Sequence, residues 1–480
     1  MQPKGLWNCF YQLTRVPRPS GHLDKIRAFL TQWAKERGIE NFVDTAGNVV
    51  MRVPATPGYE DLSIATMEAH MDMVPQKTPE STHNFEADPI ETYIDGDWVK
   101  AKGTTLGSDD GIGVATAMAI FDDKTIPHGP LEAIFTVDEE SNMYGVNNLK
   151  SDTLKGRILL NLDNETEGEM VIGSAGGEDV IAELEYCEVD VPKDLVGVRL
   201  TLKGLKGGHS GLEINEGRAN SGKLMARLLT DIIEKHDAGL VEFTSGNMRN
   251  AIPSSSVAVI VVPAEKVPAI RTLAESWLLT FNSEYKATEE PMQLLVEQVP
   301  TPAKMAPSEI RDNAVNAVMA CPAGVHRMIP ETPSIVETSC NLGIVSLKGG
   351  LFNTDVLVRS SCDSQLVALE NSVKAVFSMA GMGTRLRGHY GSWQPDFSSP
   401  LVALIRKVYR EMFDEDCHVQ VVHAGLECSI IKSHYPDMDM VSFGPTLRSP
   451  HTPNERCYIP TVAKYYEFVK KLLVSLPKAR

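Results

Sequence analysis

Cysteine is sparse and unpatterned in this chain. The eight cysteines are dispersed over 480 residues, without a Cys-x-x-Cys pair or a dense framework. Disulfide scaffolds are short and cysteine-rich, so these residues are interpreted as reduced thiols of a cytoplasmic protein. The first residues show no basic segment followed by an apolar one, so no secretory signal is expected.

Long hydrophobic runs and an excess of positive charge are also missing. The longest apolar runs, such as 257–263, have the length of a strand, whereas a membrane span needs about 20 apolar residues. The formal net charge is −17. Nucleic acids and anionic membranes attract basic patches, so neither is expected as a partner.

The length predicts more than one domain. The chain has 480 residues, and a single hydrophobic core rarely grows past roughly 250–300 residues. The pattern of predicted helices and strands changes near 189 and changes back near 390. We therefore predict one domain made of residues 1–187 and 391–480, interrupted by an inserted domain at 188–390.

Helix and strand patterns differ between these parts. The first part has helical periodicity at 23–37 and 111–121, and strand patterns at 41–53, 62–74, 131–137 and 157–163. This alternation predicts an α/β fold with a mostly parallel sheet. The insert mixes strands at 196–203, 255–263, 335–348 and 352–360 with a helix at 221–235, which predicts an α+β domain. Residues 385–395 are interpreted as the return linker, and 462–476 as a final helix.

Polar residues follow the predicted strands of the first part. His70 and Asp72 end one strand, Glu139 and Glu140 follow another, and Asp163 follows a third. Ligands bind at the carboxyl ends of strands in open α/β sheets. Taken singly, each signal also fits a capped strand end.

Two further segments carry candidate ligands. Asp109 lies in a glycine-rich turn before the helix at 111–121, and His451 lies in a loop rich in glycine and proline. Alone, the first also fits an N-capped helix, and the second a surface histidine.

The order of these signals resembles a known family. His-x-Asp, Gly-x-Asp-Asp-Gly, Glu-Glu, Asp and a late Gly-Pro…His resemble the co-catalytic zinc peptidases and deacylases that include carboxypeptidase G, aminoacylase and carnosinase. Longer strings resemble the aminoacyl-histidine (Xaa-His) dipeptidase subgroup, over about residues 5–475; they lie at 70–77, 93–107, 205–211, 249–253, 423–428 and 444–455. Asp110 departs from the asparagine expected in many members, but it is not an expected ligand.

The resemblance implies a two-metal centre. Asp109 would bridge two Zn²⁺ ions, with His70 and Asp163 completing one site and Glu140 and His451 the other. Nitrogen and oxygen ligands also suit Mn²⁺ or Co²⁺. The peptide bond between Asp109 and Asp110 is expected to be cis.

The resemblance also implies the catalytic and substrate-binding roles. Glu139 would act as general base for a metal-bridging water, and Asp72 would orient His70. The insert is expected to act as a lid that closes over the substrate. Its substrate-binding candidates, together with one from a later loop, are His209, Asn250, Arg359 and Gly425.

The implied function is hydrolysis of dipeptides, of the Xaa-His type exemplified by carnosine. A carboxypeptidase or an N-acyl amino acid deacylase on the same scaffold is the alternative enzyme, and a non-catalytic binding protein is the alternative of another class. Family members act as homodimers, or as monomers whose duplicated lid imitates one. His209 could therefore serve its own active site or that of a partner.

Overall fold

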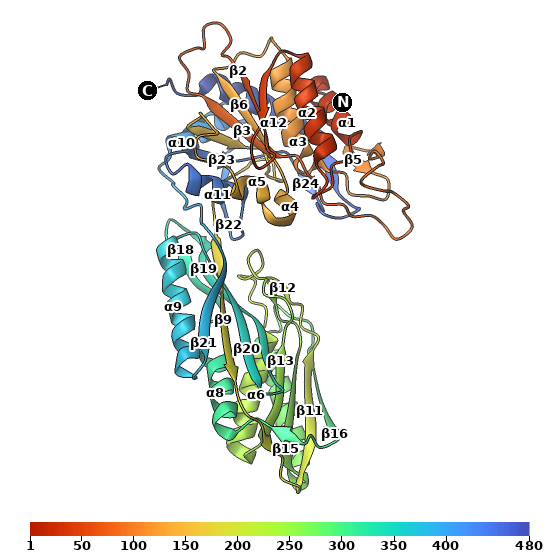
Figure 1. Ribbon diagram of the computed structural model, residues 1–480, viewed down its shortest axis with the longest axis vertical. Helices are drawn as coiled ribbons and strands as arrows, with labels where there is room; N and C mark the ends of the chain where they lie inside the picture. The colour runs from red at the N-terminus through yellow and green to blue at the C-terminus, as the bar shows by residue number, and fades with distance from the viewer. Residues whose placement is uncertain (480) are drawn as a thin grey trace. The chain divides into compact units, whose positions relative to one another are not determined.

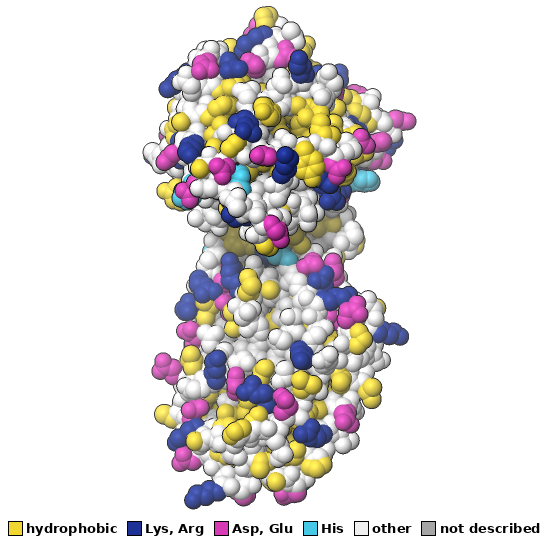
Figure 2. Space-filling view, turned by 90° about the vertical axis from the view of Figure 1, so that its right-hand side faces the viewer, with side chains coloured by type: hydrophobic (Ala, Val, Ile, Leu, Met, Phe, Trp, Pro, Cys, Tyr) yellow, Lys and Arg dark blue, Asp and Glu magenta, His cyan; other side chains and the backbone are white. Residues whose placement is uncertain are grey.

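The computed structural model describes residues 1–479, which form two compact units. Unit 1 comprises Met1–Gly173, Pro395–Val421 and Leu426–Arg480, and unit 2 comprises Ser174–Gln394 and Val422–Gly425. Within residues 1–479, no helix combines the length and the apolar character needed to cross a bilayer. On the face shown in Figure 2, acidic and basic side chains are interspersed over each unit.

Unit 1 is built on an eight-stranded sheet. In spatial order its strands are β1 (Glu40–Val43), β2 (Val49–Val53), β6 (Leu131–Thr136), β3 (Ala65–His70), β7 (Ile158–Asn161), β23 (Asp439–Ser442), β8 (Glu169–Ser174) and β22 (His418–Val422). The pairs β6–β3, β3–β7 and β7–β23 are parallel. The pairs β1–β2, β2–β6 and β23–β8 are antiparallel. The sheet is therefore mixed, with its parallel part in the four central strands.

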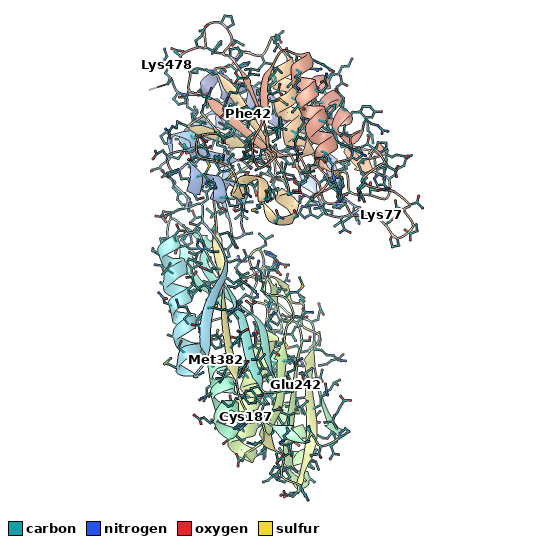
Figure 3. All side chains as sticks on the ribbon, viewed as in Figure 1. Phe42, Lys77, Cys187, Glu242, Met382 and Lys478 are labelled. Atoms are coloured by element: carbon teal, nitrogen blue, oxygen red, sulfur yellow. The ribbon has the colours of Figure 1, made fainter. Side chains whose placement is uncertain are left out.

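Helices and a small sheet complete unit 1 (Figure 1). The helices are α1 (Lys4–Thr14), α2 (Asp24–Glu36), α3 (Ser108–Asp122), α4 (Glu139–Asn142), α5 (Tyr144–Asn147), α10 (Pro400–Phe413), α11 (Glu427–His434) and α12 (Ile459–Ser475). The small sheet has the order β24 (Leu447–Arg448), β25 (Arg456–Tyr458), β5 (Trp98–Ala101) and β4 (Thr92–Asp95). Lys77 lies in the long connection between β3 and β4 (Figure 3).

The helix α3 is buried along almost its whole length because most of its side chains after Asp110 are apolar and many are small. Every residue from Ser108 to Phe121 is buried, and α3 packs against α1 and β3. A surface helix has one polar face, so α3 is an internal element. Its first turn lies beside the end of β3.

Unit 2 is built on a nine-stranded sheet. Its strands run β16 (Gln293–Val299), β11 (Leu195–Lys203), β15 (Ser256–Pro263), β13 (Gly239–Ser245), β19 (Thr332–Lys348), β20 (Leu351–Ser360), β9 (Gly176–Glu185) and β21 (Gly383–Tyr390), and β18 (Gly324–Ile329) also pairs with β19. Two short pairs accompany this sheet: β10 (Val189–Asp190) with β17 (Lys304–Met305), and β12 (Gly208–His209) with β14 (Ala251–Ile252).

Four helices cover the sheet of unit 2, namely α6 (Ser221–His236), α7 (Val267–Glu284), α8 (Ser308–Ala320) and α9 (Asp363–Met379). In Figure 1, α9 runs alongside β9 and β21, which it contacts. The core lies between the helices and the sheet, and it includes Phe243, Phe281, Phe352 and Phe377. All eight cysteines of the chain are free, and Cys187 (Figure 3) is exposed just after β9.

Three expectations need correction. Residues 41–53 form the hairpin β1–β2 and not one strand, because the Asp44 carboxylate accepts the N–H groups of Ala46, Gly47 and Asn48 in a tight turn. Unit 2 begins at Ser174 and not at 188, because β9 pairs with both β20 and β21.

The third correction concerns 385–395. Much of this segment belongs to the edge strand β21 and not to a linker, and unit 2 accordingly extends to Gln394. A further short segment, Val422–Gly425, also belongs to unit 2.

Candidate metal centre and substrate-binding residues

The five predicted ligands lie together in unit 1. His70 ends β3, Asp109 opens α3, Glu140 lies in α4 after β6, Asp163 follows β7, and His451 lies between β24 and β25. Because β6, β3 and β7 are parallel neighbours, the residues that follow them meet at one edge of the sheet.

Asp109 lies between two groups of side chains. Its Oδ1 lies 3.1 Å from Nε2 of His70, and its Oδ2 lies 3.1 Å from Nε2 of His451. His70 Nε2 is also 3.7 Å from Oδ1 of Asp163, and His451 Nε2 is 3.0 Å from Oε2 of Glu140. The two carboxylate oxygens of Asp109 therefore face different histidine–carboxylate pairs.

The spacing of these atoms suits a shared metal site. Donor atoms held at about 2.0–2.2 Å by one tetrahedral zinc lie roughly 3.3 Å from one another. One donor atom each from His70, Asp109 and Glu140 lies within 4.8 Å of the others. The peptide bond between Asp109 and Asp110 is cis, as expected.

The charge of the cluster also suits cations. Within residues 1–479, the ion pairs of Asp109, Asp163 and Glu140 are with His70 and His451. Glu140 Oε1 is buried without a hydrogen-bond partner. Carboxylates gathered in this way repel one another unless protons or cations compensate them.

The pKa values reflect this crowding. Burial raises the pKa of Glu139 to about 8, opposed by His70 and reinforced by Glu140 and Asp109. Burial also raises the pKa of Asp163. Hydrogen bonds to Asp109 and Glu140 raise the pKa of His451 to about 11. Without a metal, the cluster therefore holds protons that a cation would displace.

Asp72 organises the turn that carries the glutamates. It is fully buried and accepts the N–H of Glu139 at 3.2 Å and the N–H of Glu140 at 3.3 Å. The Ser20 hydroxyl donates to its Oδ2 at 2.7 Å, and its Oδ1 faces Nδ1 of His70 at 3.5 Å. Asp72 thus joins the end of β3 to the start of α4.

Two buried residues beside the cluster support it, although no sequence pattern indicates them. Arg18 donates to the carbonyls of Asp72 and Gly107. Glu455 accepts the N–H groups of Leu106, Gly107, Ser108 and Asp109 and the Ser108 hydroxyl. These bonds fix the loop that presents Asp109. Glu455 stands in the string 444–455, but nothing in the sequence indicates its partners.

The predicted substrate-binding residues lie in unit 2. His209 and Asn250 lie on adjacent segments, joined by the N–H of Ser210 donating to the Asn250 carbonyl at 2.9 Å. A Cβ on Gly211 would meet the His423 carbonyl at 2.2 Å and Nε of Arg359 at 3.3 Å. Glycine at this position therefore lets the turn after His209 approach both Arg359 and the 422–425 segment that contains Gly425.

His209 is held as a neutral hydrogen-bond donor. Its Nδ1 accepts the N–H groups of Gly211 at 3.1 Å and Leu212 at 3.0 Å, so the neutral ring carries its proton on Nε2. Burial and the nearby Arg359 lower its pKa. Nε2–H can therefore donate to a substrate oxygen on which negative charge develops.

Arg359 is a buried cation in this region. It is 5% exposed, and its Nε is buried without a partner. His423, another residue that the sequence left without a role, bonds the Ser339 hydroxyl at 2.7 Å. Burial, Arg359 and His209 lower the pKa of His423 to about 3, so its ring is neutral.

The sequence and structure of the chain are similar to known peptidases. Residues 66–475 match the model of peptidase family M20/M25/M40. The cytosol non-specific dipeptidase of Escherichia coli K12 is 39% identical over 99% of this chain and 98% of its own length. The aminoacylhistidine dipeptidase structure from Vibrio alginolyticus is 39% identical, with a TM-score of 0.94, and the match covers 100% of this chain and 98% of that one.

A more distant structure shares the fold. Aminopeptidase PepT from Bacillus cereus is 16% identical with a TM-score of 0.57, over 98% of each chain. Together, the family match and the full-length relatives assign the protein: the chain belongs to peptidase family M20/M25/M40 and is a peptide-bond hydrolase.

Proposed function

We propose that the chain is a two-metal dipeptidase that hydrolyses dipeptides of the Xaa-His type. The observation that carries the two-metal centre is the position of Asp109, whose two oxygens face separate histidine–carboxylate pairs. The relative named cytosol non-specific dipeptidase supports dipeptides as substrates and a cytoplasmic location, and the relative named aminoacylhistidine dipeptidase supports the Xaa-His type.

His70, Asp163 and Asp109 would hold one ion, and Glu140, His451 and Asp109 the other. The set contains nitrogen and oxygen donors, which suits Zn²⁺ and allows Mn²⁺ or Co²⁺. When bound, such ions polarise the scissile carbonyl and acidify water near neutral pH.

Glu139 is the proposed proton carrier. It takes a proton from the attacking water and passes it to the leaving amine, so one peptide and one water give two amino acids. Nearby cations would lower its raised pKa and keep it ionised as a base. Asp72, which accepts the N–H of Glu139, holds this carboxylate near the metal ligands.

Residues of unit 2 are proposed to bind the substrate. The Nε2–H of His209 would donate to the carbonyl oxygen of the scissile bond, and the guanidinium of Arg359 would bind the C-terminal carboxylate. Asn250 and Gly425 would contact the substrate backbone. Unit 2 would thereby act as a lid, and a homodimer would allow His209 to serve the partner's site.

The test of the catalytic role is Glu139→Ala. We expect kcat to fall by about two decades or more, the loss typical of a missing general base, while the metal content stays at that of the unchanged protein. Ser141→Ala, an exposed change on the same short helix, is the control and should retain activity. Full activity in Glu139→Ala would overturn the proposed mechanism.

The test of the substrate class is a panel of dipeptides, tripeptides and N-acyl amino acids with metal quantification. Dipeptides, and among them those with C-terminal histidine, should give the highest kcat/KM. Preference for acyl amino acids or longer peptides would instead favour a deacylase or carboxypeptidase.

A further inference from the structure

One cross-strand row in the sheet of unit 2 carries Arg359. In this row, Ser339 of β19 pairs with Arg359 of β20, Arg359 pairs with Gly177 of β9, and Gly177 pairs with Tyr390 of β21. Directly opposed residues of a sheet point to the same face. The side chains of Arg359 and Tyr390 therefore stand on either side of a position that has no side chain.

Gly177 leaves the space in which these two side chains meet. A Cβ at Gly177 would lie 2.5 Å from Oη and 2.7 Å from Cζ of Tyr390, which no real contact allows. Because this space is free, the Tyr390 ring lies over β9. Its hydroxyl accepts a hydrogen bond of 2.6 Å from Nη1 of Arg359.

Arg359 has no carboxylate partner within 4.0 Å among residues 1–479, although a buried carboxylate lies close by on β9. That carboxylate, Asp179, is already paired with Arg249 at 3.0 Å and with Arg387 at 3.1 Å. A buried guanidinium without a counter-ion is costly. The guanidinium of Arg359 is therefore available to bind an anion from outside the chain.

We propose that Tyr390 is a positioning residue that fixes the rotation of the Arg359 guanidinium for the substrate carboxylate. An arginine fork recognises a carboxylate through two parallel hydrogen bonds, so its orientation matters as much as its charge. The hydroxyl of Tyr390 anchors one end of the fork and leaves other N–H groups, including the unpartnered Nε, for the ligand. This inference rests on the carboxylate-binding role proposed for Arg359.

The test is Tyr390→Phe, which removes the anchoring hydroxyl and keeps the ring over Gly177. We expect KM for a dipeptide to rise about ten-fold with little change in kcat, as for loss of one hydrogen bond to a charged group. For the same dipeptide with a C-terminal amide, the variant and the unchanged protein should have similar KM. Tyr186→Phe, which removes another buried hydroxyl of unit 2, is the control and should leave KM unchanged.

A double-mutant cycle with Arg359→Met separates this inference from the proposed function. We expect Arg359→Met to raise KM for the free dipeptide and Tyr390→Phe to add nothing in its background. An unchanged KM in Arg359→Met would overturn the carboxylate-binding role itself. Two outcomes would overturn the positioning role alone. One is a raised KM in Arg359→Met with an unchanged KM in Tyr390→Phe. The other is that the effects of the two substitutions on KM add fully in the double variant.

Gly177→Ala gives a second, independent variant. The added methyl group must displace the Tyr390 ring, so KM should rise as in Tyr390→Phe while the thermal unfolding profile shows that unit 2 still folds. A folded Gly177→Ala protein with unchanged KM would contradict the proposal.

Discussion

Glu455 is 2% exposed and lies shortly after His451 in the same loop. Its two oxygens accept four backbone N–H groups at 2.7–3.2 Å, ending with that of Asp109. A carboxylate can accept several such bonds with its two oxygens. The side-chain amide of glutamine has one acceptor oxygen, and its NH2 group would point toward backbone N–H groups that are themselves donors. Glu455 therefore decides how firmly the Asp109 loop is held.

The change Glu455→Gln should lower the free energy of unfolding by about 2–3 kcal/mol, because buried N–H groups lose their charged acceptor. It should also weaken zinc binding, since Asp109 is no longer fixed. Urea unfolding and competition with a zinc chelator measure the two effects. Glu467→Gln, an exposed change on α12, should alter neither; equal stability of both variants would show that Glu455 is dispensable.

At the residue scale, the sequence could indicate the candidate ligands but not the residues that support them. His70, Asp109, Glu140, Asp163 and His451 are recognisable because their order and their places after strands form a pattern. Glu455 and Tyr390 act through partners far away in the chain, 346 positions from Asp109 for Glu455 and 31 from Arg359 for Tyr390. No local pattern encodes such partners.

Among the elements, β21 differs most from its sequence pattern, which predicts a linker over 385–395. Most of its residues are exposed, as expected for an edge strand with one free side, so the alternation of buried and exposed residues that predicts a strand is absent. Gly388, at φ 69°, further interrupts the pattern. Interior elements such as α3 and β6 were predictable because burial imposes a mostly apolar composition on them.

The helix α12 gives a prediction at the scale of an element. Leu472 is fully buried in it, so Leu472→Ala should lower the free energy of unfolding by about 2–5 kcal/mol through lost contacts and a cavity. Urea unfolding followed by circular dichroism measures this loss. Lys471→Ala, at the neighbouring exposed position, should stay within about 0.5 kcal/mol of the unchanged protein; a similar loss in both would show that α12 does not pack as described.

For the molecule as a whole, stability without metal should depend on pH. Burial raises the pKa of Glu139 from 4.5 to about 8 and of Glu165 from 4.5 to about 7, and the hydrogen bonds of His451 raise its pKa from 6.5 to about 11. Between the ordinary and the raised pKa, each group binds more protons folded than unfolded. Stability must therefore fall as pH rises through this window.

Thermal unfolding of chelator-treated protein should accordingly give a lower Tm at about pH 8.5 than at about pH 5.5. Added zinc should largely remove this dependence, because the ions replace the protons. Zinc binding near neutral pH should also release protons, detectable by calorimetry in buffers of different ionisation enthalpy. A Tm that rises with pH in the metal-free protein would contradict the charge balance of the cluster.

The bond between His451 and Asp109 joins positions 342 apart in the chain, and residues 174–394, which form most of unit 2, are made between them. A chain still on the ribosome therefore lacks His451 until almost the whole chain has been translated. Because the proposed metal centre includes His451, a chain that ends before this residue is expected to lack peptidase activity. The order of the proposed ligands along the chain therefore implies that activity is acquired only when nearly the whole protein has been made.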